Sequence, residues 1–179
     1  MPVGGHPQDA AALVFRRATR DDLPAIVAML ADDPLGALRE ANTSPLPRCY
    51  HDAFDAIDRD PNIELVVVQA GGSGALGISK VPGVLGVLQM SFIPNISHRG
   101  GWRALIEGVR VAAESRSGGV GRQMLLWAVE RARQRGCLMV QLTSDKTRTD
   151  AIRFYEGLGF VASHEGMKLH LPRGDGGDG

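Results

Sequence analysis

The sequence predicts a single α/β domain with a central sheet of mixed strand directions and helices on its faces. Short β-branched runs alternate with amphipathic helical stretches along most of the chain. A glycine-dense turn at residues 117–121 joins one such strand to the clearest helix. No linker or internal repeat divides the 179 residues, and this length can bury one substantial core. We therefore expect one domain over residues 12–172, with disordered Gly-, Pro- and Asp-rich ends at 1–11 and 173–179.

Helical periodicity predicts two helices in the first third of the chain. Thr19 and Asp22 form a Thr-x-x-Asp capping box, and the apolar residues after it fall on one helical face: Leu23, Ile26, Val27 and Leu30. Residues 49–58 return to helical spacing. The proline-containing stretch between them, residues 32–47, predicts a loop or a broken helix.

Runs rich in β-branched residues predict the strands of the sheet, at residues 13–18, 64–70, 84–92, 105–112 and 138–143. Residues 71–74 are glycine-rich turn material, and residues 93–101 form a loop long enough to shape a pocket. His98 in that loop is either a lining residue of that pocket or an ordinary surface histidine. We expect residues 160–171 to add one or two final strands.

Two further helices are expected in the second half. Residues 120–135 carry an apolar stripe of Val120, Met124, Leu125, Ala128, Val129 and Ala132, and Gly136 suits the C-terminal cap. Residues 147–156 form a shorter helix, for which Thr147 and Asp150 would supply a capping box.

Charge and cysteine usage exclude several classes of protein. The 20 basic and 20 acidic residues cancel, so the sequence lacks the basic excess of nucleic-acid-binding and membrane-surface proteins. It shows no secretory signal and no transmembrane segment. Cys49 and Cys137 have no metal-ligand spacing and predict buried, reduced thiols and a cytoplasmic location. The histidines show no metal spacing either, so we expect no metal.

The glycine-dense turn predicts an anion site. Glycines let successive backbone N–H groups converge, and the first turn of a helix adds unpaired donors and the positive end of its dipole. The turn lacks the Gly-Lys-Ser/Thr of a nucleotide triphosphatase loop and the third glycine of a dinucleotide fingerprint. Its pattern, Arg116-x-x-Gly119-x-Gly121, resembles the diphosphate-binding loop of the GCN5-related N-acetyltransferases (GNAT). A structural loop that holds no ligand is the alternative.

A second motif extends this resemblance. Ala151-x-x-Phe154-Tyr155-x-x-x-Gly159-Phe160 is similar to a signature that the GNAT family places one helix and one strand after the diphosphate loop. The two motifs together cover roughly the last half of the chain. Arg148 is a departure, because the family often has asparagine there; an arginine can bind a phosphate instead.

The resemblance implies a GNAT-like fold with a Gly-rich strand-loop-helix site, and acetyl-CoA as the cosubstrate. The backbone of Val109 and Val111 would pair with the pantetheine arm and polarise the thioester carbonyl, and Gly108 suits a bulge that frees these groups. The residues expected to hold the cofactor are Val109, Arg110, Val111, Arg116, Ser117, Gly118, Gly119, Val120, Gly121, Arg122, Arg148 and Phe154. Lys146 is a further basic residue around the inferred diphosphate site.

Acetyl transfer to an amine needs an acid for the leaving thiolate and a base for the ammonium. The family's motif makes Tyr155 the candidate acid, since a phenol with a pKa near ~10 is protonated at neutral pH; a packed aromatic beside Phe154 is the alternative. Glu107 is the candidate base, acting directly or through water, because a carboxylate in an otherwise apolar strand needs a reason. A salt bridge to Arg103 or another basic residue is the alternative there. Asp145 and Glu114 are weaker candidates for the base.

We therefore expect an N-acetyltransferase that moves the acetyl group of acetyl-CoA to a primary amine of a small molecule, by direct attack in a ternary complex. The alternatives are a peptide or protein amine as acceptor, a longer acyl chain, and a non-catalytic acyl-CoA-binding regulatory module. The acceptor would be bound by residues 32–57, the 93–101 loop and the C-terminal strands. No nucleic acid or membrane is expected as a partner; relatives often form dimers, and the sequence leaves the oligomeric state open.

Overall fold

The computed structural model describes residues 12–32, 36–71 and 83–171. The ends predicted to be disordered, 1–11 and 173–179, lie outside these residues, as does most of the predicted turn at 71–74. The chain divides into two compact units, one ending at Leu142 and one beginning at Thr143. Each is described here by itself.

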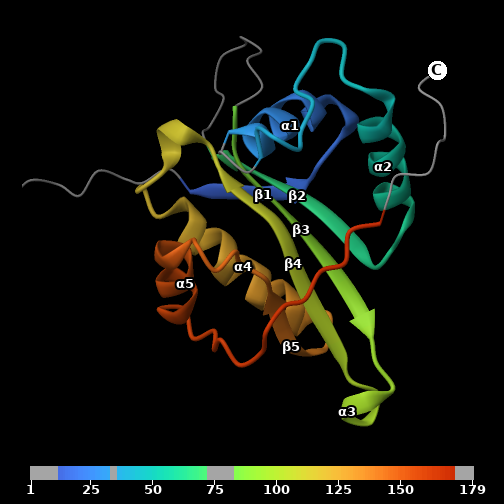
Figure 1. Ribbon diagram of the computed structural model, residues 1–179, viewed down its shortest axis with the longest axis vertical. Helices are drawn as coiled ribbons and strands as arrows, with labels where there is room; N and C mark the ends of the chain where they lie inside the picture. Colours follow the sequence, from blue (N-terminus) through green and yellow to red (C-terminus); the bar gives the residue numbers. More distant parts are fainter. Residues whose placement is uncertain (1–11, 33–35, 72–82, 172–179) are drawn as a thin grey trace, which may run out of the picture. The chain divides into compact units, whose positions relative to one another are not determined.

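The first unit is built on a five-stranded sheet with the strand order β1-β2-β3-β4-β5 (Figure 1). Its strands are β1 (Leu13–Arg17), β2 (Ile63–Ala70), β3 (Val84–Pro94), β4 (Trp102–Val111) and β5 (Cys137–Leu142). Neighbours from β1 to β4 are antiparallel, and β5 is parallel to β4. The five predicted strands and the mixed strand directions are confirmed.

Helices cover both faces of this sheet. A 3-10 turn, η1 (Arg20–Asp22), leads into α1 (Leu23–Ala31), and α2 (Arg48–Arg59) precedes β2. Apolar residues of α1 and α2 pack in one buried cluster with Val67 and Val87. Gly86 precedes Val87 in β3, and it lies against the Met124 side chain of helix α4 (Val120–Gln134). Adjacent residues of a strand point to opposite faces, so α4 lies on the face opposite to α1 and α2.

Gly86 sets how closely α4 approaches β3. A Cβ atom at this position would come within 2.6 Å of the Met124 sulfur and 3.1 Å of the Arg110 carbonyl oxygen. The side chain of Met124 is fully buried, so it has little room to move away. A glycine is therefore required where the helix rests on the sheet.

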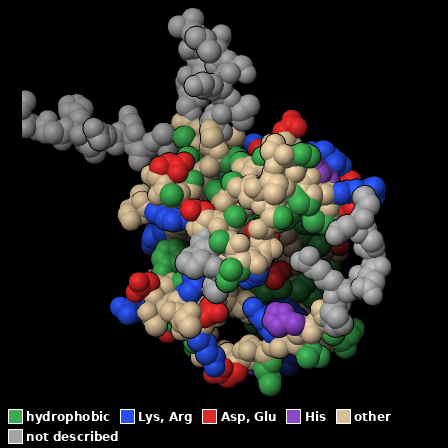
Figure 2. All heavy atoms as spheres, turned by 45° about the horizontal axis from the view of Figure 1, so that its top comes forward, with side chains coloured by type: hydrophobic (Ala, Val, Ile, Leu, Met, Phe, Trp, Pro, Cys, Tyr) green, Lys and Arg blue, Asp and Glu red, His purple; other side chains and the backbone are tan. Residues whose placement is uncertain are grey.

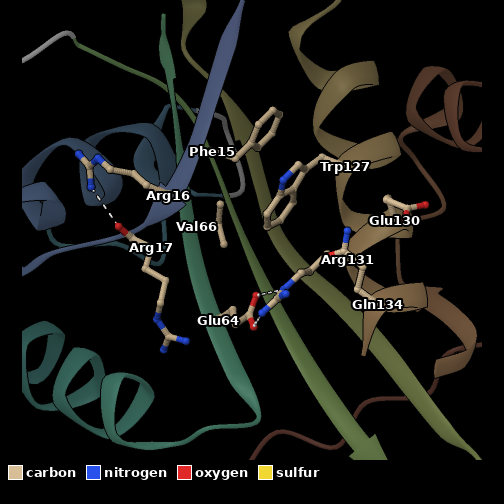
Figure 3. Close-up of a pocket in the computed structure, with 9 residues that line it drawn as sticks. All are labelled: Phe15, Arg16, Arg17, Glu64, Val66, Trp127, Glu130, Arg131 and Gln134. Carbon is tan, nitrogen blue, oxygen red and sulfur yellow. Dashed lines mark hydrogen bonds and ion pairs between the residues drawn. The ribbon is translucent and has the colours of Figure 1, made fainter. Parts of the chain in front are cut away.

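A buried ion pair ties α4 to β2. The Arg131 guanidinium donates two hydrogen bonds to the Glu64 carboxylate, at 2.9 and 2.6 Å (Figure 3). Glu64 is 4% exposed, and both of its oxygens are satisfied by this one bidentate partner. The pair thus replaces the water that the carboxylate loses on burial.

Asp22 joins β1 to the start of α1. Its carboxylate accepts hydrogen bonds from Arg16 at 2.7 and 2.8 Å and from the N–H and hydroxyl of Thr19 at 2.7 and 2.9 Å. The predicted capping box at Thr19 is confirmed. The hydrogen bonds from Arg16, aided by those from Thr19, lower the pKa of Asp22 to about 2.

This lowered pKa predicts a loss of stability in acid. The carboxylate stabilises the fold above its unfolded pKa of about 3.9, and this contribution is lost as the pH falls toward 2. We expect Asp22→Asn to lower the free energy of unfolding by about 2 kcal/mol at pH 7. The difference from the wild type should shrink toward zero near pH 2, as measured by urea unfolding across that range. An unchanged difference would show that charge on Asp22 does not matter.

Between Thr143 and Leu171 the second unit contains one helix, α5 (Thr149–Glu156). The predicted capping box at Thr147 is wrong, because the helix begins two residues later and Thr147 instead donates to Asp145 from its N–H and hydroxyl, at 2.9 and 2.6 Å. Tyr155 packs edge-on against Phe154 and Phe160, with ring centroids 5.4 and 6.1 Å apart.

The predicted C-terminal strands are not found. Residues 160–171 are described but form no strand, and Val161, Met167, Leu169 and Leu171 are exposed. A strand needs a neighbour for its backbone groups. The described residues of the second unit contain no strand that could pair with residues 160–171. The alternation of apolar and polar residues in this segment is therefore not enough to form a strand.

Candidate functional site

Strand β4 carries the predicted bulge at Gly108. Glu107 lies opposite Gln89 of β3 and Arg110 lies opposite Val87, so that Gly108 and Val109 together oppose only Leu88. Gly108 has a φ of 59°, a left-handed conformation that favours glycine. Such a bulge bends the strand and disrupts the ladder of hydrogen bonds locally.

Beyond the bulge, β4 and β5 separate. Their parallel pairing ends at Ile106 and Leu142, while β4 continues to Val111. The N–H of Ala112 donates to the carbonyl of Leu85 at 2.9 Å, toward β3. Because backbone groups alternate sides along a strand, those of Val109 and Val111 face the edge that β5 has left. This edge can pair with an extended ligand.

Two arginines cap the carbonyl groups of this edge. Arg110 donates to the carbonyl of Val109 at 2.9 Å, and Arg116 donates to the carbonyl of Val111 at 3.2 Å. Arg116 also binds the carboxylate of Asp32, next to the end of α1, at 2.5 Å. The side chain of Arg116 therefore fastens the loop to β4 and α1, a role that the spacing of the motif did not predict.

The glycine loop has the geometry expected of an anion site. Ser117 and Gly119 have φ values of 67° and 77°, and Gly119 is the N-cap of α4. No side chain among the described residues caps the helix there, so the first N–H groups of α4 point outward from its N-terminus. A Cβ atom at Gly119 would meet nothing within 4 Å, which leaves the space in front of these donors open. Arg122, in the first turn of α4, is exposed beside it.

Glu107 lies next to the bulge and is exposed. It makes no ion pair or hydrogen bond with any residue that the structure describes, so the alternative of a salt bridge to Arg103 is not observed. Simple alternation along a strand would place Glu107 on the same face as Val109, but the bulge at Gly108 intervenes. Glu107 lies on the face of Val87 and α1, and the extra residue of the bulge turns Val109 to the other face.

Sequence reasoning missed the polar residues that accompany Glu107. Gln89 and Ser91 of β3 lie on the same face as Glu107, where they are half-buried. Their signal is in the alternation Val87-Leu88-Gln89-Met90-Ser91-Phe92, in which Leu88, Met90 and Phe92 are fully buried on the opposite face. Polar residues at alternate positions of a central strand indicate that this part of the face is not covered by the apolar core.

The predicted site residues thus fall into two groups. The first unit brings together Glu107, the open edge of β4 and the glycine loop. The second unit holds Tyr155 and Phe154 on α5, with Arg148 at its N-terminal end.

Asp145, a weaker candidate for the base, accepts two hydrogen bonds from Thr147, which lower the pKa of its carboxyl. It is a turn residue. Glu114 is exposed in the short η2 (Ala113–Ser115).

Two cavities of the first unit lie away from this chemistry. One of about 240 Å³ lies among β1, β2 and α4, where Trp127 stacks on Phe15 above the Glu64–Arg131 pair (Figure 3). Another, of about 580 Å³, lies between the start of α1, residues 42–46 and His51. Neither is lined by the glycine loop or by Glu107.

The remaining sequence expectations concern metals, membranes and thiols. The described residues contain no cluster of His, Cys, Asp or Glu suited to a metal ion. None of the helices in the described residues is long and apolar enough to cross a bilayer. Both cysteines are free, but the expectation that both are buried is wrong, because Cys49 is exposed and Cys137 is only half-buried.

The connection between β3 and β4 consists of residues 95–101. It includes the short α3 (Ser97–Gly100), in which His98 and Arg99 have φ values of 54° and 56°. His98 is exposed, as expected for a surface histidine.

Comparison with known proteins agrees with this geometry. The chain is 27% identical over 150 residues to an aminoalkylphosphonate N-acetyltransferase of Salmonella typhimurium, covering 84% of this chain and 86% of that protein. It is 47% identical to a solved protein described as a transcriptional regulator from Bacillus halodurans C-125, with a TM-score of 0.80 and coverage of 89% and 100%.

A Trypanosoma brucei acetyltransferase shares the fold, with a TM-score of 0.68 at 24% identity over 89% of this chain and 100% of that one. The model of the acetyltransferase (GNAT) family matches residues 27–160. That match spans strands β2 to β5, the glycine-dense loop at residues 117–121, α4 and α5. The chain therefore belongs to the GNAT family of acetyltransferases, and it is an acyltransferase that depends on acetyl-CoA.

Proposed function

We propose that this enzyme transfers the acetyl group of acetyl-CoA to a primary amine of a small molecule, by direct attack in a ternary complex. The observation that carries the proposal is the open edge of β4, which runs from the bulge at Gly108 to the glycine loop with Glu107 at its start. One continuous strip of backbone can therefore hold an extended thioester beside a free carboxylate.

The cofactor would be held mainly by backbone groups. The N–H groups of Val109 and Val111 would pair with the pantetheine arm and polarise the thioester carbonyl. The diphosphate would lie against the residues that run from the loop into α4, which are Ser117, Gly118, Gly119, Val120, Gly121 and Arg122. The open space at Gly119 supports this fit. Arg110 and Arg116 act by fixing the edge and the loop, and Arg148 and Phe154 complete the predicted set.

The transfer moves three protons. The carboxylate of Glu107, directly or through one water, would take a proton from the ammonium group of the acceptor. The amine nitrogen then attacks the carbonyl carbon, the C–S bond breaks, and the phenol of Tyr155 would give its proton to the leaving thiolate. The nitrogen still carries a second proton after the attack and would give it to the Tyr155 phenolate. The proton on Glu107 leaves to solvent, and the amide and free CoA are the products.

Direct attack is favoured over a covalent acyl-cysteine intermediate. The nucleophile in that route would be a thiolate, which needs a lowered pKa. Burial raises the pKa of the Cys137 thiol. Cys49 is exposed near the start of α2, and it does not fall within a recognised nucleophile motif.

Replacing Glu107 tests its role as the base. We expect Glu107→Gln to lower kcat by about 10²-fold, since the amide is nearly isosteric but cannot take a proton. The Kd for acetyl-CoA should change less than about 2-fold, because the cofactor contacts are to other residues. Glu130→Gln, at an exposed position of α4, is the matched control and should leave kcat unchanged. Equal rates for the two variants would remove Glu107 from the mechanism.

A second candidate function follows from the Bacillus halodurans relative described as a transcriptional regulator. On that basis the chain would be an acyl-CoA-binding module that signals to a protein partner. Direct DNA binding is disfavoured because the 20 basic and 20 acidic residues cancel. On the face shown in Figure 2, acidic and basic side chains are interspersed.

Calorimetric titration with acetyl-CoA, followed by thiol release when small amines and peptides are added, tests the proposal. Binding with amine-dependent release is the expected result. Release with peptides alone would move the acceptor from small molecules to proteins. Binding without release by any amine would favour the regulatory module, and absence of binding would contradict the assignment of the glycine loop.

A further inference from the structure

One face of β4 presents a cation, an apolar side chain and a carboxylate in a row. Arg103, Leu105 and Glu107 alternate along the strand and so share a face, while Ala104 and Ile106 between them are 0% and 2% exposed on the other face. Arg103 and Leu105 are half-buried and Glu107 is exposed. At about 3.3 Å per residue, roughly 13 Å separate the Cα atoms of Arg103 and Glu107.

The guanidinium of Arg103 has no counter-ion among the described residues. Its Nε atom is buried and has no hydrogen-bond partner there. Most buried donors in folded proteins are satisfied, so an orphaned one indicates a role other than packing. A guanidinium presents a planar fork of donors that matches a carboxylate, phosphate or phosphonate.

The partner strand supplies hydrogen-bonding groups along this row. Gln89 lies directly opposite Glu107, and Ser91 lies directly opposite Leu105. Directly opposed side chains have Cβ atoms about 5 Å apart, so both polar groups border the row. The aliphatic chain of a ligand can cross Leu105 while polar groups meet its two ends.

We infer that the acceptor is an amine that also carries an anionic group a few carbons away. Arg103 binds the anion, Leu105 contacts the alkyl chain and Glu107 receives the amine. This inference rests on the proposed function and names its substrate class. The aminoalkylphosphonate of the Salmonella enzyme's name combines these same three parts.

Acceptor selectivity tests the role of Arg103. The probes are 2-aminoethylphosphonate, 3-aminopropylphosphonate and β-alanine, each compared with propylamine and ethanolamine, two amines that carry no anionic group. In the wild type we expect kcat/KM to be highest for one of the amines with an anionic group. Arg103→Gln should lower kcat/KM for that amine by about 10- to 100-fold, the value of a charged hydrogen bond. The kcat/KM for propylamine and ethanolamine should change less than about 2-fold, because these amines have no anionic group to bind the guanidinium.

Arg133→Gln is the control. Arg133 lies on α4, on the opposite side of the sheet, and its side chain is exposed beside Glu130. This variant should keep the wild-type selectivity. Retention of the melting temperature and of acetyl-CoA binding by Arg103→Gln would exclude a loss of fold.

The failures are distinguishable. If propylamine and ethanolamine are acetylated as well as the amines with an anionic group, or if Arg103→Gln leaves selectivity unchanged, the inference is overturned and the acetyltransferase proposal stands. If acetyl-CoA binds but only the amines without an anionic group react, the inference is likewise overturned. If acetyl-CoA binds and no amine of either kind reacts, both are overturned.

Discussion

Replacing Gly119 with leucine is expected to abolish measurable binding of acetyl-CoA while the protein remains folded. A Cβ atom at this position meets nothing within 4 Å, so the side chain starts in open space. It would fill the region in front of the first N–H groups of α4, where the diphosphate is proposed to lie. The φ of 77° adds strain of about 1–2 kcal/mol, which a domain of this size can tolerate. Calorimetry with acetyl-CoA and thermal unfolding measure the two effects.

Gly136 provides a matched control for this substitution. It follows the other end of α4, has a φ of 72°, and a Cβ atom there also meets nothing within 4 Å. Gly136→Leu should therefore lose a similar amount of stability and keep its affinity for acetyl-CoA. If Gly136→Leu weakened acetyl-CoA binding as much as Gly119→Leu, backbone strain would explain the loss, and not a side chain that fills the diphosphate site.

Replacing Tyr155 with phenylalanine is expected to lower kcat by about 10²- to 10⁴-fold without weakening acetyl-CoA binding. The substitution removes only the hydroxyl group, and the ring keeps its edge-on contacts with Phe154 and Phe160. Steady-state thiol release and calorimetry on the same preparation give kcat and Kd. A regulatory module would lose nothing in this variant.

Phe160→Leu controls for disturbance of the aromatic cluster. It removes one ring beside Tyr155 while leaving the phenol in place. We expect a smaller loss of kcat, accompanied by a lower melting temperature. If Phe160→Leu slows the enzyme as much as Tyr155→Phe, the tyrosine acts through packing and not as an acid.

Local patterns were enough to predict most of the fold. The five strands, α1, α2, α4 and α5 all occur where periodicity placed them, because each has a long enough run of one period. Gly136 ends α4 as expected, with its N–H donating to the carbonyl of Arg133 at 2.9 Å. One exception is residues 160–171, where one or two strands were expected and none is found, because no strand among the described residues pairs with this segment. The others are at element ends, such as Thr147, which hydrogen-bonds to Asp145 and does not cap α5.

The site was predicted less completely because its geometry depends on pairing between strands. The sequence of residues 105–112 does not show whether Gly108 pairs with a residue of β3 or forms a bulge. Whether Glu107 and Val109 share a face could therefore be decided only from the register between β4 and β3. The tether from Arg116 to Asp32 joins residues far apart in the chain and has no local signal. The only sequence signal for Arg103, Gln89 and Ser91 was that they are polar residues within otherwise apolar strands.

The bulge at Gly108 has a consequence for how such an enzyme can diversify. Before the bulge, β4 presents side chains that are proposed to choose the acceptor; after it, the same strand presents backbone groups that are proposed to hold the cofactor. Side-chain identity can change at Arg103, Leu105 or Gln89 without altering the main-chain donors at Val109 and Val111. Substrate choice is thereby uncoupled from cofactor retention within one strand, so new acceptors can be acquired by single substitutions while the older half of the reaction is inherited intact.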